Sequence, residues 1–332
     1  MRSPSEFRTG KPGFYPDQSV YAEFACAEFG LDFRDLDGGS GLLFSVASRD
    51  RLQHFGAGRC SWYPQNSATA STLASDKHFA SRILREAGLP ALGGEYFFLH
   101  DRHRAHRPAG HERSDALACF QRLGGSAFVK PLAGSRGDFA QAVHCEAALV
   151  RYLSDVAKYY DAILMQPIVE GIEYRVFVLD DDVLYCARKY PPSVTGNGVD
   201  TLRDLLAVHN DALRARGLSP ASLPDNDSSL NAVPANGERY EIPGRMNLSA
   251  GGTMVLADAP SENALTLARQ AARAIGLRVA AIDMFVDVGG KPDPNEIIEV
   301  NSNPSIRLLE DSGRGDLILK ILHHTFTVMG LL

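Results

Sequence analysis

The chain has 332 residues, of which 45% are hydrophobic and 22% charged, and its formal net charge at pH 7 is −6. A chain of this length can bury more than one core, so we expect two or three domains. The negative net charge argues against a general nucleic-acid surface, and no apolar run approaches the roughly 20 residues that a membrane span requires.

The N-terminal sequence and the cysteines bear on the compartment. The stretch MRSPSEFRTGKPGFYP lacks the apolar core of a signal peptide. The five cysteines are widely spaced, odd in number and form no CxxC pair. We therefore expect reduced thiols in a cytoplasmic protein that has neither nucleic-acid nor membrane partners.

Residues 1–71 are predicted to form a reduced N-terminal α/β lobe. Residues 19–29 have the pattern of an amphipathic helix that ends at Gly30, and residues 31–36 and 42–47 have the pattern of strands. The segment is too short for a full doubly wound domain, so we expect it to pack on the residues that follow.

Residues 72–166 are predicted to form a second domain. A helix is expected at 75–87, where Gly88 stops it. The His- and Arg-rich segment 100–113 is interpreted as a surface loop, because its histidine spacings match no zinc site. The other elements expected here are a strand at 128–131, a glycine-bearing loop at 133–138, a helix at 146–156 and a buried strand at 162–166.

Residues 167–332 are predicted to form a third domain. Strands at 173–179 and 183–188 should pair as a hairpin. The other elements expected here are helices at 200–216 and 261–275, joined by a polar connection at 219–240. Because several strands are linked by hairpins, the order of elements favours an α+β or mixed α/β protein in lobes over a uniform Rossmann array.

The segment 280–306, AAIDMFVDVGGKPDPNEIIEVNSNPSI, carries acidic residues in apolar strands. A buried carboxylate is costly unless another charge compensates it. Glu299 and Asn301 should share one face of their strand, roughly 7 Å apart. If the two strands pair, Asp283 can approach the same point, and these oxygen ligands suit Mg²⁺ that also binds substrate phosphates. Three nearby acids are interpreted as solvent-facing residues of an edge hairpin: Asp287, Asp293 and Glu296.

Cations lie where the phosphates of a nucleotide would need them. Lys77 begins a predicted helix, and Lys130 ends a strand just before the loop AGSRG. Arg188 ends another strand, and Arg245 precedes a Gly-Gly pair. Backbone N–H groups of a glycine loop can hold phosphate oxygens, although such a loop alone indicates only a turn. No Walker A sequence occurs in the chain.

The stretch ILMQPIVEGIEYR leaves one strand and returns as another. Gln166 and the backbone after it could face an adenine edge, and Glu173 could face ribose hydroxyls. The alternative is a hinge between lobes with a surface glutamate, and both interpretations can hold together.

The ordered motifs of the chain resemble a known family. Lys77, FVKP, AGSRG, MQPIVEGIEYR, CARKYP, RMNLSAGGT, IDMFVD and IIEVNSNP together are similar to the ATP-grasp carboxylate–amine ligases. The resemblance covers residues 72–309 and is greatest to the ATP-grasp part of cyanophycin synthetases and of bifunctional glutathione synthetases. It implies an ATP-grasp fold with a reduced N-terminal α/β lobe.

The resemblance also implies roles for particular residues. Lys77, Lys130 and the loop residues Ser135, Arg136 and Gly137 would bind ATP phosphates, with Gln166 and Ile168 at the adenine and Glu173 at the ribose. Arg188 and Arg245 would act at the transferred phosphoryl group. Asp283, Glu299 and Asn301 would bind two Mg²⁺ ions, with Mn²⁺ as an alternative. Asn303 and Arg307 would lie near the acceptor substrate.

Two departures limit what carries over. Asp138 and Phe139 replace the small or Lys residues that often follow the loop, and neither the Mur-ligase-like half of cyanophycin synthetase nor the cysteine-ligase half of the glutathione enzymes is present. The activity implied is ATP-dependent ligation of a carboxylate, such as an amino acid or peptide, to an amine through an acylphosphate. The alternatives are a phosphotransferase on the same fold and a non-catalytic ATP-binding regulatory module. The sequence leaves open the substrates, the pathway and whether the protein is a homodimer.

Overall fold

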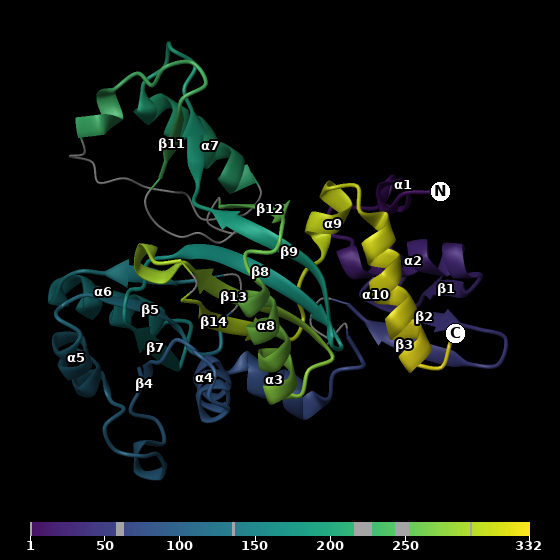
Figure 1. Ribbon diagram of the computed structural model, residues 1–332, viewed down its shortest axis with the longest axis horizontal. Helices are drawn as coiled ribbons and strands as arrows, with labels where there is room; N and C mark the ends of the chain where they lie inside the picture. Colours follow the sequence, from purple (N-terminus) through teal and green to yellow (C-terminus); the bar gives the residue numbers. More distant parts are fainter. Residues whose placement is uncertain (1, 58–62, 135–136, 216–227, 243–251, 293) are drawn as a thin grey trace.

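The computed structural model describes the whole chain apart from residues 1, 58–62, 135–136, 216–227, 243–251 and 293 (Figure 1). Among the described strands there is a three-stranded sheet, β1-β2-β3, and a four-stranded sheet, β4-β7-β5-β6. A five-stranded sheet has the order β12-β9-β8-β13-β14, and β10 pairs with β11. The predicted mixture of helices with hairpin-linked strands is confirmed.

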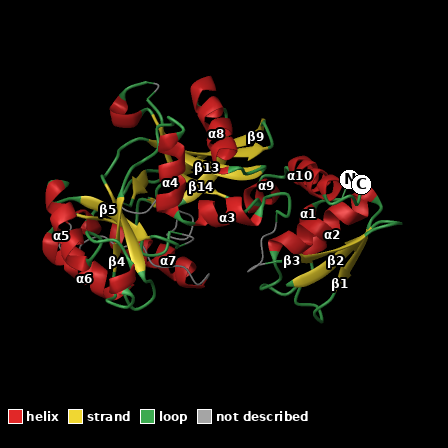
Figure 2. Ribbon diagram, turned by 90° about the horizontal axis from the view of Figure 1, so that it is seen from below, coloured by secondary structure: helices red, strands yellow, loops and turns green. Residues whose placement is uncertain are grey.

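The N-terminal lobe packs its sheet against helices from both ends of the chain. Its elements are α1 (Pro4–Arg8), α2 (Asp17–Phe29), β1 (Asp32–Asp35), β2 (Leu43–Ala47) and β3 (Leu52–Gly56). The C-terminal helix α10 (Gly315–Val328) lies beside α2, and both termini lie at this lobe (Figure 2). Gly30 ends α2 in the left-handed conformation, with φ 70°. Strand β3 was not predicted, because its only buried side chain is Phe55 and it shows no clear alternation.

The helix predicted at 75–87 is α4 (Lys77–Glu86), and a further helix that was not predicted, α3 (Ala68–Ser75), precedes it. Asp76 separates them with extended backbone, and its carboxylate accepts hydrogen bonds from the backbone N–H groups of His78 and Phe79, each at 2.9 Å. An N-cap of this kind starts a new helix and ends the preceding one. Lys77 therefore occupies the first position of α4.

The four-stranded sheet belongs to a small lobe covered on one face by two helices. Its elements are β4 (Glu95–Phe98), η1 (Arg104–His106), α5 (Arg113–Arg122), β5 (Ala127–Pro131), β6 (Gln141–Val143), α6 (Glu146–Val156) and β7 (Ala162–Gln166). The side chains of Phe97, Val129 and Ile163 pack against those helices. The His- and Arg-rich segment lies on the surface, and residues 100–106 are all exposed.

The five-stranded sheet is the centre of the large lobe. Its strands are β8 (Ile172–Leu179), β9 (Asp182–Tyr190), β12 (Thr253–Ala257), β13 (Val279–Val286) and β14 (Glu296–Asn301). One face packs on α3, α4 and α8 (Glu262–Ile275) through residues such as Ile282 and Met284 (Figure 2). The other face packs on the N-terminal lobe through Phe177 and Ala281. The turn η4 (Val288–Gly290) joins β13 to β14, and α9 (Arg307–Asp311) follows β14.

A small module projects from the edge of the large lobe (Figure 1). It consists of β10 (Ser193–Thr195), α7 (Leu202–Ala215), η2 (Ser228–Asn231) and β11 (Arg239–Glu241). It has its own small core, formed by Val194, Leu202, Leu206, Leu230 and Ile242. Part of the polar connection expected at 219–240 lies outside the described residues.

One predicted domain boundary coincides with the end of a strand, and the other lies within a helix. The boundary between 166 and 167 coincides with the end of β7, and residues 167–171 link the four-stranded sheet to the five-stranded one. The boundary between 71 and 72 falls inside α3. The division into three domains stays a prediction. No helix in the described part of the chain is both long and apolar enough to cross a membrane.

Asn66 ties the segment before α3 to the start of β13. Its Nδ2 donates to the carbonyls of Val279 at 2.8 Å and Ser302 at 3.0 Å, and its Oδ1 accepts from the N–H groups of Arg278 and Val279. Asn66→Ala leaves these buried groups unpaired, so we expect a loss of at least about 2 kcal/mol in the free energy of unfolding. Urea denaturation and amide hydrogen exchange at Val279 measure it. Thr72→Ala, which removes an exposed hydroxyl from α3, should change stability by less than about 0.5 kcal/mol, and an equal loss in both variants would contradict the assignment.

Candidate active site

The hairpin of β13 and β14 places Asp283 directly opposite Glu299. Asp283 is 1% exposed, although the strand that carries it is otherwise apolar. Its neighbours Ile282 and Met284 pack into the core on the other face of the sheet. The predicted pairing, which brings one carboxylate from each strand together, is therefore confirmed.

Asn301 lies between these two carboxylates. Its Nδ2 is 3.4 Å from Oδ2 of Asp283 and 3.3 Å from Oε1 of Glu299. A half-turn of the amide would exchange Nδ2 for Oδ1, and oxygen atoms of all three side chains would then surround one point. Such a donor set fits a hard divalent cation. The described residues contain no group of three or more His, Cys, Asp or Glu side chains that could hold a metal, so a cation here depends on the amide and on oxygens from a substrate.

Two basic residues that were not predicted as site residues neutralise Asp283. Arg175 on β8 lies opposite Asp283, with Nε 2.7 Å from Oδ1 and Nη2 2.8 Å from Oδ2. Lys189 on β9 places Nζ 3.0 Å from Oδ2 of Asp283 and also pairs with Glu173. Each of these side chains is at most 15% exposed. We call Glu173, Lys189, Asp283 and Arg175 the charge row, because their charges alternate.

Burial and ion pairing act in opposite directions on the charge row. Burial opposes ionisation of Asp283, but the charges of Arg175 and Lys189 outweigh it and hold the pKa of Asp283 well below its ordinary value. Burial dominates at Glu173, where the pKa is raised despite the contact with Lys189. The pKa of Lys189 is raised, because its two carboxylate partners outweigh its own desolvation. The row is therefore held together by its ion pairs in an environment that would otherwise disfavour every charge in it.

A β-bulge decides which cation of β9 faces the site. Phe177 pairs with Tyr185, but Val178 pairs with Val183, so Leu184 is an extra residue in β9. If the pairing of Val178 with Val183 at the hairpin end continued along both strands without a bulge, Arg188 would lie opposite Glu173. The bulge shifts that register by one residue, and Lys189 takes this position instead.

Arg188 consequently lies on the other face of the sheet, opposite Tyr174, with its guanidinium 4.9 Å from the ring centre of Tyr190. The structure does not bring Arg188 to the carboxylates of Asp283 and Glu299, and its role at the transferred phosphoryl group stays a prediction. The other predicted arginine, Arg245, lies outside the described residues.

Lys77 and Lys130 approach the site from the small-lobe side. The ammonium of Lys77 donates to the carbonyl of Gly134 at the start of the glycine loop. Lys130 is 5% exposed, and among the described residues no carboxylate lies within ion-pair distance of it. Burial, together with the charge of Lys77, lowers the pKa of Lys130 to about 8, although the charge of Glu299 opposes both effects. Burial also lowers the pKa of Lys77. Two desolvated ammonium groups are thus directed at one region, where an anion would relieve their cost.

The glycine loop is anchored by the two residues that depart from the family pattern. Asp138 accepts a hydrogen bond from the hydroxyl of Tyr160 at 2.9 Å. Phe139 adopts a positive φ of 52°, and its ring centre lies 5.5 Å from that of Tyr159. Both residues therefore fix the end of the loop to the turn before β7. Gly137 has a φ of 65°, which suits glycine, whereas Ser135 and Arg136 lie outside the described residues.

The link between the two large sheets uses the side chain of Gln166. That side chain is buried, and its Nε2 donates to the carbonyl of Leu92 at 3.1 Å. Its amide is therefore engaged with the backbone of Leu92 and Gly93, which precede β4, and this leaves the backbone of the link as the part available to a ligand. Ile168 in this link is 40% exposed. The adenine contacts of both residues stay predictions.

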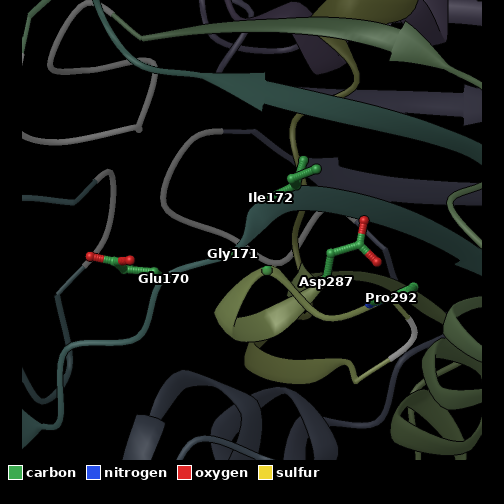
Figure 3. Close-up of a pocket in the computed structure, with 6 residues that line it drawn as sticks. Glu170, Gly171, Ile172, Asp287 and Pro292 are labelled. Carbon is green, nitrogen blue, oxygen red and sulfur yellow. The ribbon is translucent and has the colours of Figure 1, made fainter.

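A hollow beside this link is formed where it meets the β13–β14 turn (Figure 3). The N–H of Gly289 donates to the carbonyl of Glu170 at 3.0 Å, and a side chain at Gly171 would come within 2.9 Å of Phe285. The residues that line the hollow are Glu170, Gly171, Ile172, Asp287, Gly290 and Pro292. None of them belongs to the charge row. Asp287 and Glu296 are both half-buried rather than solvent-facing as predicted, and Asp293 lies outside the described residues.

The predicted acceptor residues follow β14. Asn303 is exposed. Arg307 is bound by carboxylates, with Nε 2.8 Å from Asp311 and Nη1 3.3 Å from Asp17. Its guanidinium therefore joins α9 to α2, and a role with the acceptor stays a prediction for both residues.

The fold is similar to that of known ATP-grasp ligases. A bifunctional glutathione synthetase from Pasteurella multocida superposes with a TM-score of 0.57 at 18% identity, over 93% of this chain and 44% of that chain. A D-alanine–D-alanine ligase from Bacillus anthracis superposes with a TM-score of 0.52 at 14% identity, over 79% of this chain and 71% of that chain. The chain therefore has the ATP-grasp fold.

Sequence comparison also finds ligases of this kind. The glutathione biosynthesis bifunctional protein of Enterococcus faecalis is 26% identical over 257 residues, which are 71% of this chain and 32% of that protein. Cyanophycin synthetase of Trichormus variabilis is 28% identical over 264 residues, which are 71% of this chain and 27% of that protein. The chain thus spans about a third or less of the length of these relatives. No family model matches the chain. The resemblance to ATP-grasp ligases that the motifs predict is confirmed.

The buried ammonium of Lys130 should make the wild-type protein less stable than a Lys130→Met variant. Its pKa is about 8 in the folded protein and 10.5 in the unfolded chain. The burial cost is therefore full below pH 8 and disappears as the pH rises to about 10.5. We expect Lys130→Met to be more stable by about 3 kcal/mol at pH 7, with the difference much smaller at pH 10.

Urea denaturation at the two pH values measures this difference. Lys320→Met, at an exposed position of α10, serves as the control and should show no such pH dependence. A Lys130→Met variant that is less stable than wild type at pH 7 would contradict the interpretation.

Proposed function

We propose that the chain is an ATP-dependent ligase that joins a carboxylate to an amine through an acylphosphate and releases ADP and phosphate. The observation that carries this proposal is the convergence of Asp283, Glu299 and Asn301 on one face, with two desolvated lysines, Lys77 on α4 and Lys130 on β5, whose charges interact with Glu299. A metal–phosphate site needs oxygen ligands on one side and ammonium groups on the other. The ATP-grasp fold and the relatives support the same function.

Each group in the site has a part in binding ATP. Lys77 and Lys130 bind phosphate oxygens, and the N–H groups of the glycine loop assist them. Glu173 accepts hydrogen bonds from ribose hydroxyls. Residues 167–171 offer backbone groups to the adenine. Divalent cations held by the three oxygen ligands, two Mg²⁺ or alternatively Mn²⁺, neutralise charge on the phosphates when bound.

The reaction transfers the γ-phosphoryl group to a substrate carboxylate. An amine then attacks the acyl carbon, and phosphate leaves. Lys189, rather than Arg188, is the cation of β9 that lies next to the metal ligands, so we assign to it the stabilisation of charge on the transferred group. Arg245 is proposed for the same task. No protein nucleophile is needed in this scheme, because ATP activates the carboxylate.

The substrates are proposed as amino acids or small peptides. One relative is named for glutathione biosynthesis and another for cyanophycin synthesis, and both products contain amide bonds between amino acids. A cytoplasmic location and a homodimeric state stay predictions.

The requirement for two substrates distinguishes ligation from the alternatives. Purified protein with ATP and Mg²⁺ should release phosphate only when a carboxylate and an amine are both present, and mass spectrometry should find a condensed product. A screen over pairs of amino acids and peptides tests this. Phosphate transfer to a single substrate without condensation would indicate a phosphotransferase. Nucleotide binding without turnover across the whole screen would indicate a regulatory module.

Glu299→Gln keeps the size of the side chain but removes its charge from the metal ligands. We expect it to lower substrate-dependent ADP formation by at least about a hundredfold, because it weakens charge stabilisation in the transition state. Glu296→Gln makes the same change on the same strand and should retain most activity. Circular dichroism and thermal melting should show that both variants fold. Wild-type turnover by Glu299→Gln would remove Glu299 from the site.

A further inference from the structure

The charge row gives the site its own cations. Both oxygens of Asp283 accept hydrogen bonds from Arg175, and Oδ2 also contacts Lys189. Lys189 contacts Glu173 as well, so it bridges the two acids. Asp283 is therefore a carboxylate that already has two cationic partners in the described part of the chain.

The charges around the site leave no negative surplus for a free cation. Among the described residues, the carboxylates and bases whose charges interact here are four acids, Asp76, Glu173, Asp283 and Glu299, and four bases, Lys77, Lys130, Arg175 and Lys189. Their charges cancel when all are ionised. A free divalent cation would therefore meet no net negative charge and would have to share Asp283 with two bases. A nucleotide brings several negative charges and favours the same region.

We infer that this site takes up a divalent cation only together with a nucleotide, because Arg175 and Lys189 compete with a free cation for Asp283. The inference rests on the proposed function, in which the three oxygen ligands hold the metal. It makes Lys189 a residue that controls access of the metal, in addition to its proposed contact with the transferred group.

The two cations differ in how readily they can be displaced. Arg175 binds Asp283 through two parallel hydrogen bonds, which fix the orientation of the carboxylate. Lys189 is a point charge on a flexible stem that is divided between two acids. When a ribose engages Glu173, Lys189 loses one of its partners and can turn toward the phosphates. Arg175 is thus the positioning residue for Asp283, and Lys189 is the competitor.

Metal binding can be measured without any ligation. The free Mn²⁺ signal in electron paramagnetic resonance reports metal affinity, and calorimetry reports nucleotide affinity. In the wild-type protein, Mn²⁺ alone should bind weakly, and ADP should strengthen its binding by about tenfold or more. By linkage, Mn²⁺ should strengthen ADP binding by the same factor.

Substitution of Lys189 isolates the competing charge. Lys189→Met should strengthen Mn²⁺ binding in the absence of nucleotide by about tenfold or more, and the coupling to ADP should shrink accordingly. Lys189→Arg keeps the charge and should leave Mn²⁺ binding weak. Arg188→Met removes the adjacent charge on the opposite face of the sheet and should match the wild type.

The double variant Lys189→Met/Asp283→Asn tests whether Lys189 acts on the metal through Asp283. It should lose the stronger Mn²⁺ binding that Lys189→Met alone is expected to show. Equal Mn²⁺ affinity with and without ADP in the wild type would overturn the inference, and this measurement needs no variant to fold. Unchanged Mn²⁺ affinity in a folded Lys189→Met variant would overturn it as well. Since no condensation is measured, these outcomes are separate from failure to find substrates in the ligation screen.

Discussion

The buried carboxylate of Asp283 is the constraint on which the rest of the site depends. It lies on β13, an inner strand of the five-stranded sheet, and is 1% exposed. An isolated charge at such a position would be very unfavourable. The neighbouring strands supply the compensation, Arg175 from β8 and Lys189 from β9. A binding site and an internal ion-pair network are thereby built from the same atoms.

The same interaction links parts of the fold that are distant in sequence. Glu173 lies near the start of β8, just after the link from the small lobe, and Lys189 connects it to Asp283. Lys130 on β5 of the small lobe and Lys77 on α4 add two ammonium groups that are desolvated. Binding of a polyanion would therefore connect the small lobe to the charge row through charge.

Much of the site could be predicted because side chains alternate along a strand. That rule places Glu299 and Asn301 on one face of their strand. It also places Asp283 on the face opposite to that of its apolar neighbours Ile282 and Met284. The same rule would have indicated Arg175, which is two residues from Glu173 on one strand. It could not choose between Arg188 and Lys189, because the choice depends on the bulge at Leu184. The N-cap of α4 at Asp76 could be predicted, but helix α3 could not, because its Ser- and Thr-containing sequence ATASTLAS has only a weak helix propensity.

The bulge at Leu184 has a consequence for how this site can change during evolution. Loss of Leu184 alone would remove the bulge and leave the pairing on both sides of it unchanged, so Lys189 would still lie opposite Glu173. Loss of the bulge without loss of a residue would instead slip the register by one residue and exchange Lys189 for Arg188. A related chain without the bulge is therefore aligned correctly only with a one-residue gap at Leu184, and an ungapped alignment would compare side chains from opposite faces of the sheet.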